Sequence, residues 1–203
     1  NLSGYSGADI TVISITLTFD ENNWNVPQTV TVTAIDNLVA DGNRTTTITN
    51  GVTTNAATPY AAVIAASVTV NVADNDTPGV VINPTNPGVI EGGAAQTYTA
   101  VLLSQPTTGE IVTVTMSGYN GADIAVAPAT LTFDENNWNV PQTVTVTPID
   151  NLVADGNRST TIANGVSSSI GTTPYGNGTV TAASVVVAIT DNDTPGVLIS
   201  TTS

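Results

Sequence analysis

The stretch LTFDENNWNVPQTVTVTAIDNLVADGNR, residues 17–44, occurs a second time at residues 131–158. Ala34 against Pro148 is the only difference over its 28 positions. The two copies start 114 residues apart, and a period of this length is one domain per repeat, not a short solenoid repeat. The sequence therefore predicts part of a tandem array of domains.

The repeat also predicts where the domains begin and end. Residues 77–193, from Thr-Pro-Gly to the second Asp-Asn-Asp, form one whole unit, and residues 1–76 match only the later part of it. Residues 194–203 (TPGVLISTTS) restart the unit. We expect a truncated module, a complete module and the start of a third. Because half a sandwich leaves strand edges open, we also expect a longer polypeptide, or neighbouring copies that complete the broken modules.

The composition limits the partners. The chain has sixteen acidic residues, two arginines and no lysine or histidine, so its net charge is −14. Such a chain repels nucleic acid and anionic lipid and attracts cations. The absence of cysteine excludes a disulfide scaffold and thiolate metal sites. The most apolar run, residues 60–66, is far too short to cross a bilayer, so no membrane insertion is expected.

Alternating β-branched residues predict strands throughout. Val30 and Val32 alternate with threonines in one copy, and Val185, Val187 and Ile189 occupy every second position of a strand near the end. This period of two is typical of a sheet with one buried face. The complete module offers seven strand candidates, which favour an all-β, antiparallel Greek-key sandwich of immunoglobulin type. They lie near residues 79–82, 95–104, 110–117, 124–133, 142–149, 158–164 and 180–190, with Pro148 at a strand end or an edge.

Several acids follow valine-rich strands or lie in glycine-rich bends. Because alternate strand ends of a sandwich meet at one pole, these carboxylates should gather there, and gathered carboxylates need protons or a cation. A hard cation with six to eight oxygen ligands fits, which means calcium before magnesium. Asn151, Asn157 and turn carbonyls offer further oxygens. The acids of the complete module are Glu91, Asp123, Asp150, Asp155, Asp191 and Asp193.

These features together resemble the Calx-beta domain, named for sodium–calcium exchangers and common in giant bacterial surface proteins. The resemblance rests on the strand ending in Asp-Asn-Asp, the Ile-Asp strand exit before an acidic loop, the Glu-Gly bend and the Gly-Ala-Asp loop. It implies a calcium-binding sandwich with the six acids above as ligands. In the partial module the matching positions are Asp9, Asp36, Asp41, Asp74 and Asp76.

Two departures from the family pattern bear on the metal. Asp-Asn stands at residues 36–37 and 150–151 where the family often has two acids, and Asn43 and Asn157 replace loop glutamates. Fewer charged ligands predict weaker affinity or fewer ions. Two alternatives stay open: Asp-Asn-Asp-Thr-Pro-Gly is also good turn chemistry, and Arg44 and Arg158 can pair with Asp41 and Asp155 in place of a cation.

Other motifs have plainer interpretations. The Asp-Glu pairs at residues 20–21 and 134–135 are expected to be solvated loop charges. Trp24 and Trp138 are expected to cap sandwich ends, with stacking on sugar rings as the alternative. Asn43, Asn157 and Asn177 fit the N-glycosylation pattern.

The sequence favours a structural function. Without histidine or cysteine, and without a base beside a candidate serine, we expect no enzyme. We expect a secreted or cell-surface protein that forms an adhesin stalk or the body of a filament, with calcium stiffening the junctions between modules. One alternative is a carbohydrate-binding module that uses loop tryptophans and asparagines. Another is self-assembly, in which one copy supplies the strands that another lacks.

Overall fold

The structure, a computed structural model, describes residues 1–199, and the chain divides into two compact units. Unit 1 comprises residues 1–75, and unit 2 starts at residue 76. The expected start of a further module, residues 194–203, lies partly outside the described residues, and residues 194–199 form no strand. Within residues 1–199 the helix content is one 3-10 turn, Pro59–Ala62, and no helix there could cross a membrane.

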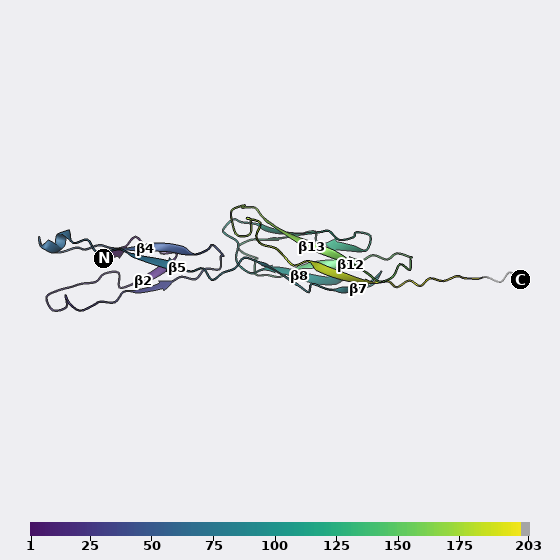
Figure 1. Ribbon diagram of the computed structural model, residues 1–203, viewed down its shortest axis with the longest axis horizontal. Coiled ribbons are helices and arrows are strands. Elements are labelled where there is room, and N and C mark those ends of the chain that lie inside the picture. The colour runs from purple at the N-terminus through teal and green to yellow at the C-terminus, as the bar shows by residue number, and fades with distance from the viewer. Residues whose placement is uncertain (200–203) are drawn as a thin grey trace. The chain divides into compact units, whose positions relative to one another are not determined.

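Unit 2 is an all-β, immunoglobulin-like sandwich of two sheets, as the sequence predicts (Figure 1). Neighbouring strands pair antiparallel, except that β14 and β7 run parallel. One sheet has the order β10 (Ile124–Ala127), β12 (Gln142–Pro148), β8 (Gln96–Leu102), β6 (Val80–Asn83). The other has the order β11 (Thr130–Phe133), β9 (Val112–Ser117), β13 (Arg158–Ser168), β14 (Val185–Thr190), β7 (Gly88–Ile90).

The core of unit 2 lies between these sheets, where the alternating residues of each strand meet. Val144 and Val146 of β12 are fully buried, as are Val185 and Val187 of β14. The threonines between the valines of β12 face outward or are half-buried. The period of two in the sequence therefore separates the core face from the solvent face.

The structure adds two details to the strand prediction. The expected strand at residues 124–133 is divided into β10 and β11, which belong to different sheets and flank Pro128. Strand β7 was missed, because three residues after Pro87 carry no readable alternation. Pro148 ends β12, as predicted.

Unit 1 has the later strands of the same fold. Strands β1 (Leu2–Ser3), β4 (Arg44–Asn50) and β5 (Val68–Val72) form one sheet, and β2 (Ile10–Ile13) pairs with β3 (Thr31–Ala34). Its buried cluster comprises Ile10, Ile48 and Val72. No strand among residues 1–75 corresponds to β6, β7 or β8.

Matching valines of the two units differ in burial. Val32 is 37 % exposed whereas its repeat counterpart Val146 is fully buried. Val68 of β5 is 51 % exposed, and its counterpart Val185 is fully buried. In unit 2 these valines are covered by the part of the domain that unit 1 does not have.

Candidate metal centre

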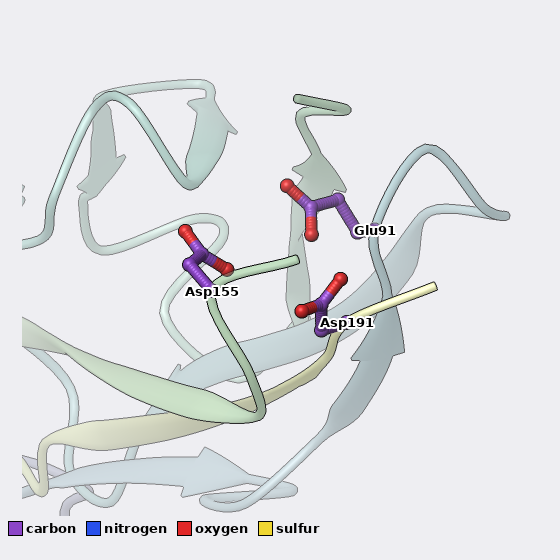
Figure 2. A group of neighbouring side chains, drawn as sticks. All are labelled: Glu91, Asp155 and Asp191. Carbon is purple, nitrogen blue, oxygen red and sulfur yellow. The ribbon is translucent and has the colours of Figure 1, made fainter. Parts of the chain in front are cut away.

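Three strand ends bring acids to one pole of unit 2. Ile90 of β7 lies opposite Thr190 of β14, so the next residues, Glu91 and Asp191, leave the sheet side by side. Strand β13 starts opposite the end of β14, which places Asp155 at the same pole. Figure 2 shows the carboxylates of Glu91, Asp155 and Asp191 close to one another. One oxygen of each lies within 4.8 Å of the others.

Arg158 binds the inner part of this acidic pole. Its Nη2 lies 3.0 Å from Glu91 Oε1, its Nε 2.7 Å from Asp123 Oδ1, and its Nη1 2.6 Å from Asp155 Oδ1. The hydrogen bonds to Glu91 and then to Asp123 raise the pKa of the guanidinium above its ordinary value, so it is always charged. The pairing with Asp155 is confirmed, and the contacts with Glu91 and Asp123 were not predicted. Arginine therefore serves as the cation for three of the six acids.

Glu91 is the most buried acid of the group, with 1 % of its surface exposed. Oε1 accepts hydrogen bonds from the Asn151 backbone N–H, at 3.0 Å, and from Asn151 Nδ2. The Asn151 side-chain oxygen is engaged by Val153 N at 2.7 Å, and Asn157 Oδ1 by Asp191 N at 3.0 Å. These asparagines thus orient the loops and the glutamate, whereas the sequence suggested them as additional metal ligands.

Among the described residues, Arg158 forms no salt bridge with Asp150, Asp191 or Asp193. We call these three acids the outer part of the pole. The Asp191 carboxylate accepts hydrogen bonds from the backbone N–H groups of Asp193, at 2.8 Å, and Gly156, at 2.5 Å. These hydrogen bonds hold the pKa of Asp191 below its ordinary value. Asp193 Oδ2 is shielded from solvent and has no hydrogen-bond partner among the described residues. Burial, and then the charges of Asp191 and Asp150, raise the pKa of Asp193.

Gly92 brings the Asp150 carboxylate close to the bend after β7. Its φ of +60° lies in the left-handed region that favours glycine, and an added Cβ would lie 2.7 Å from Asp150 Oδ1. Asn192 Nδ2 donates to the Glu91 carbonyl at 3.0 Å and lies 3.5 Å from the same Asp150 oxygen. The Glu-Gly bend, the end of β12 and the end of β14 are therefore held together.

Unit 1 has the same arrangement without the glutamate. Arg44 Nη1 lies 3.0 Å from Asp9 Oδ1 and 3.1 Å from Asp41 Oδ2, which confirms the pairing expected with Asp41. Asp36 and Asp74 line a cleft beside this arginine. Asp76 falls at the start of unit 2. Asp9, Asp36, Asp41 and Asp74, four of the predicted acids of the partial module, thus lie around Arg44.

The other motifs take structural roles. Asp134 accepts backbone hydrogen bonds from Asn136 and Asn137, and so closes a turn. Trp138 packs against the core of unit 2, as expected of a cap. Trp24, its counterpart, is exposed.

A second buried acid, Glu110, was missed by the sequence analysis. It is 1 % exposed and accepts from Thr107 N, at 2.9 Å, from Ser168 Oγ, at 2.6 Å, and from Thr173 Oγ1. Burial raises its pKa, but these bonds outweigh burial and bring the pKa below its ordinary value of 4.5. The Thr-x-x-Glu spacing of Thr107 and Glu110 was the signal that could have indicated it.

Known structures similar to this chain are β domains. The apo form of the Calx CBD1 domain is 17 % identical over 57 % of this chain and 98 % of that chain, with a TM-score of 0.42. CBD12 of CALX1.1 is 18 % identical over 56 % of this chain and 44 % of that chain, with a TM-score of 0.41. A cohesin–dockerin complex from Clostridium thermocellum is 10 % identical over 56 % of this chain and 94 % of that chain, with a TM-score of 0.36. No protein-family model and no curated protein sequence matches the chain.

Proposed function

We propose that this chain is a structural repeat segment of a modular, secreted or cell-surface protein, in which unit 2 binds one calcium ion at its acidic pole. The protein would be the stalk of an adhesin or the body of a filament. The near-identical repeats support a structural function, because duplication of a domain extends an array without requiring a new active site.

The observation that carries the calcium proposal is the buried oxygen of Asp193. A buried carboxylate oxygen without a hydrogen bond is costly unless the group is protonated or bound to a cation. Asp150 and Asp191 are the neighbours whose charges act most strongly on Asp193. Together the three supply oxygens only, which is the ligand set that calcium prefers.

Arg158 limits this proposal to one ion. It already neutralises Glu91, Asp123 and Asp155, so these acids have less charge to offer a metal. Asp150, Asp191 and Asp193 would hold the calcium ion, and the ion would supply positive charge to the outer part of the pole. It would thereby restrain Asp193, from which the chain leaves the sandwich.

Calorimetry with EDTA-treated protein tests the metal. We expect calcium binding to unit 2 that Asp193→Asn weakens at least about tenfold, since it removes a charged ligand. Asp134→Asn, which removes a charge outside the pole, is the matched control and should bind as the native chain does. Absence of calcium binding at millimolar concentration, or equal affinity in both variants, would contradict the calcium proposal.

Small-angle scattering tests the mechanical part. If the ion restrains the chain as it leaves unit 2, a longer array of these repeats should scatter as a stiffer particle in calcium than in EDTA. If EDTA leaves the scattering of the array unchanged, calcium does not stiffen the array, even where it binds. In unit 2 the carbohydrate alternative is weakened by the packing of Trp138 against the core, which leaves less of its ring for a sugar, whereas Trp24 of unit 1 is 68 % exposed.

A further inference from the structure

Four Asn-Gly pairs occur in the chain, at residues 50–51, 120–121, 164–165 and 177–178. In such a pair the backbone nitrogen of the glycine can attack the side-chain carbonyl carbon of the asparagine, because no Cβ obstructs its approach. The reaction is fastest where the side-chain amide nitrogen and the attacking backbone nitrogen are not held by hydrogen bonds. It also benefits from donors to the side-chain oxygen, which becomes negative as the ring closes.

In three of the pairs the asparagine amide nitrogen is held by an acceptor. The hydrogen bonds join Asn50 Nδ2 to the Ala66 carbonyl at 2.5 Å, Asn120 Nδ2 to Asp123 Oδ2 at 2.7 Å, and Asn164 Nδ2 to the Ala183 carbonyl at 2.8 Å. Asn164 is also buried, and it lies within β13, where pairing with β9 fixes the backbone. The nitrogen that would leave as ammonia is therefore restrained in each of these pairs.

The fourth pair lies in the loop between β13 and β14, where Asn177 and Gly178 are both exposed. The backbone N–H of Thr179 donates to Asn177 Oδ1 at 3.0 Å, and the Thr179 hydroxyl donates to the same oxygen at 2.6 Å. Among the described residues, neither Asn177 Nδ2 nor the Gly178 backbone nitrogen donates a hydrogen bond. The oxygen is thus held while both reacting nitrogens are unrestrained.

The two donors from Thr179 are placed where the reaction develops charge. Negative charge forms on Asn177 Oδ1 during the attack, and donors already aimed at such an oxygen stabilise it as an oxyanion hole does. The residues just before the pair are anchored, since Tyr175 is buried and the Asn177 backbone N–H donates to the Thr173 carbonyl at 2.9 Å. The arrangement is therefore a property of the folded loop.

We propose that Asn177, activated by Thr179, is the site at which the folded chain deamidates without an enzyme. The Gly178 nitrogen loses its proton to hydroxide and forms a bond to Asn177 Cγ. The Cγ–Nδ2 bond then breaks, and Nδ2 leaves as ammonia with a proton from water. A second water opens the five-membered succinimide at one of its two carbonyls, which gives aspartate or isoaspartate. Overall one water is consumed and one ammonia is released, with no oxidation or reduction.

Deamidation places a carboxylate in a part of the chain that has none. Residues 159–190 include no charged side chain, so the product is distinguished by its charge as well as by its mass. In isoaspartate the backbone runs through the former side chain and is longer by one carbon. The modification thus alters both the charge and the length of the loop that carries Tyr175.

Peptide mapping by mass spectrometry tests this inference on the full chain, produced in a bacterial host that does not glycosylate asparagine. The folded chain is incubated at mildly alkaline pH, and loss of the amide is followed at all four pairs. We expect Asn177 to deamidate at least about tenfold faster than the other three asparagines, since it alone combines the two donors with unrestrained nitrogens. In denaturant the four rates should become similar, because these hydrogen bonds are lost.

Thr179→Val removes the hydroxyl donor and should slow the reaction at Asn177 about threefold or more, which corresponds to one hydrogen bond. Thr179→Ser keeps the hydroxyl and is the matched control, with a rate close to that of the native chain. Similar rates at the four pairs of the folded chain, or a faster rate at another pair, would overturn the proposal. A rate that Thr179→Val leaves unchanged or raises would also overturn it. The comparison of the four pairs within one folded molecule decides the question even if a variant does not fold.

Discussion

Phe19 and Phe133 occupy the same position of the repeated stretch, yet Phe133 is fully buried and Phe19 is 53 % exposed. The residues on either side of them are identical. The difference arises from the rest of each unit, because the core that receives Phe133 includes Tyr98 and Leu102 of β8, which unit 1 does not have. Burial here is a property of the whole sandwich and not of the local sequence.

Phe133→Ala should therefore destabilise unit 2 by about 3–5 kcal/mol, the usual cost of removing a buried phenylalanine. Phe19→Ala is the matched control, and it should change the stability of unit 2 by less than about 0.5 kcal/mol. Denaturant unfolding followed by Trp138 fluorescence in a Trp24→Phe background measures unit 2 alone. Similar effects of the two substitutions would contradict the difference in burial.

Removal of the central arginine should make unit 2 dependent on calcium. Arg158→Gln leaves the buried Glu91 and its acidic neighbours without their cation, so the melting temperature in EDTA should fall by about 5 °C or more. Calcium should restore part of the loss, since it can neutralise the same carboxylates. A variant that melts like the native chain in EDTA would show that the arginine is not needed to balance the pole.

Glu110 should contribute stability only above acidic pH. Its pKa is lowered on folding, so the contribution is complete above the unfolded value of 4.5 and is lost as the pH falls through the lower folded value. Glu110→Gln should lower the free energy of unfolding by about 1–3 kcal/mol at pH 7, because it replaces the carboxylate that accepts hydrogen bonds from the Ser168 and Thr173 hydroxyls. The difference from the native chain should shrink below pH 4, and a difference independent of pH would contradict this role.

Tyr98 should set an alkaline limit to the stability of unit 2. Burial, and then Tyr119, raise its pKa to about 12, and its hydroxyl donates to Asn164 Oδ1 at 3.1 Å. A raised pKa means that the contribution is complete below the unfolded value of 10.0 and is lost as the pH rises toward 12. Tyr98→Phe should remove this alkaline loss, which unfolding measured between pH 9 and pH 12 would detect.

The sequence predicts the fold well where periodicity is strong. The alternation around Val144 and Val146 indicates a strand with one buried face, and it can be recognised from the neighbouring residues alone. It also predicts that Asp150 and Asp191 lie at one pole, because both follow such strands. It could not show β7, whose three residues have no period of their own and which is defined by pairing with β14, one hundred residues further along the chain.

The centre of the site was harder to predict for a different reason. The spacing of Asp155 and Arg158 indicates a local pair, and that pair is present. That the same guanidinium also contacts Glu91 and Asp123 depends on how three loops meet, and no spacing records it. The open face of unit 1 could be anticipated from the strands that it lacks. That Arg44 Nε is buried without a hydrogen-bond partner among residues 1–199 could be seen only from atomic positions.

The parallel pairing of β7 with β14 has a consequence for a chain under tension. These strands belong to the first and last segments of unit 2 and point the same way, so a pull on the two ends of the unit drags them in opposite directions along their length. Their hydrogen bonds are then loaded in shear and must break together, instead of unzipping one at a time. The same contact that brings Glu91 beside Asp191 would therefore act as a clamp against mechanical unfolding.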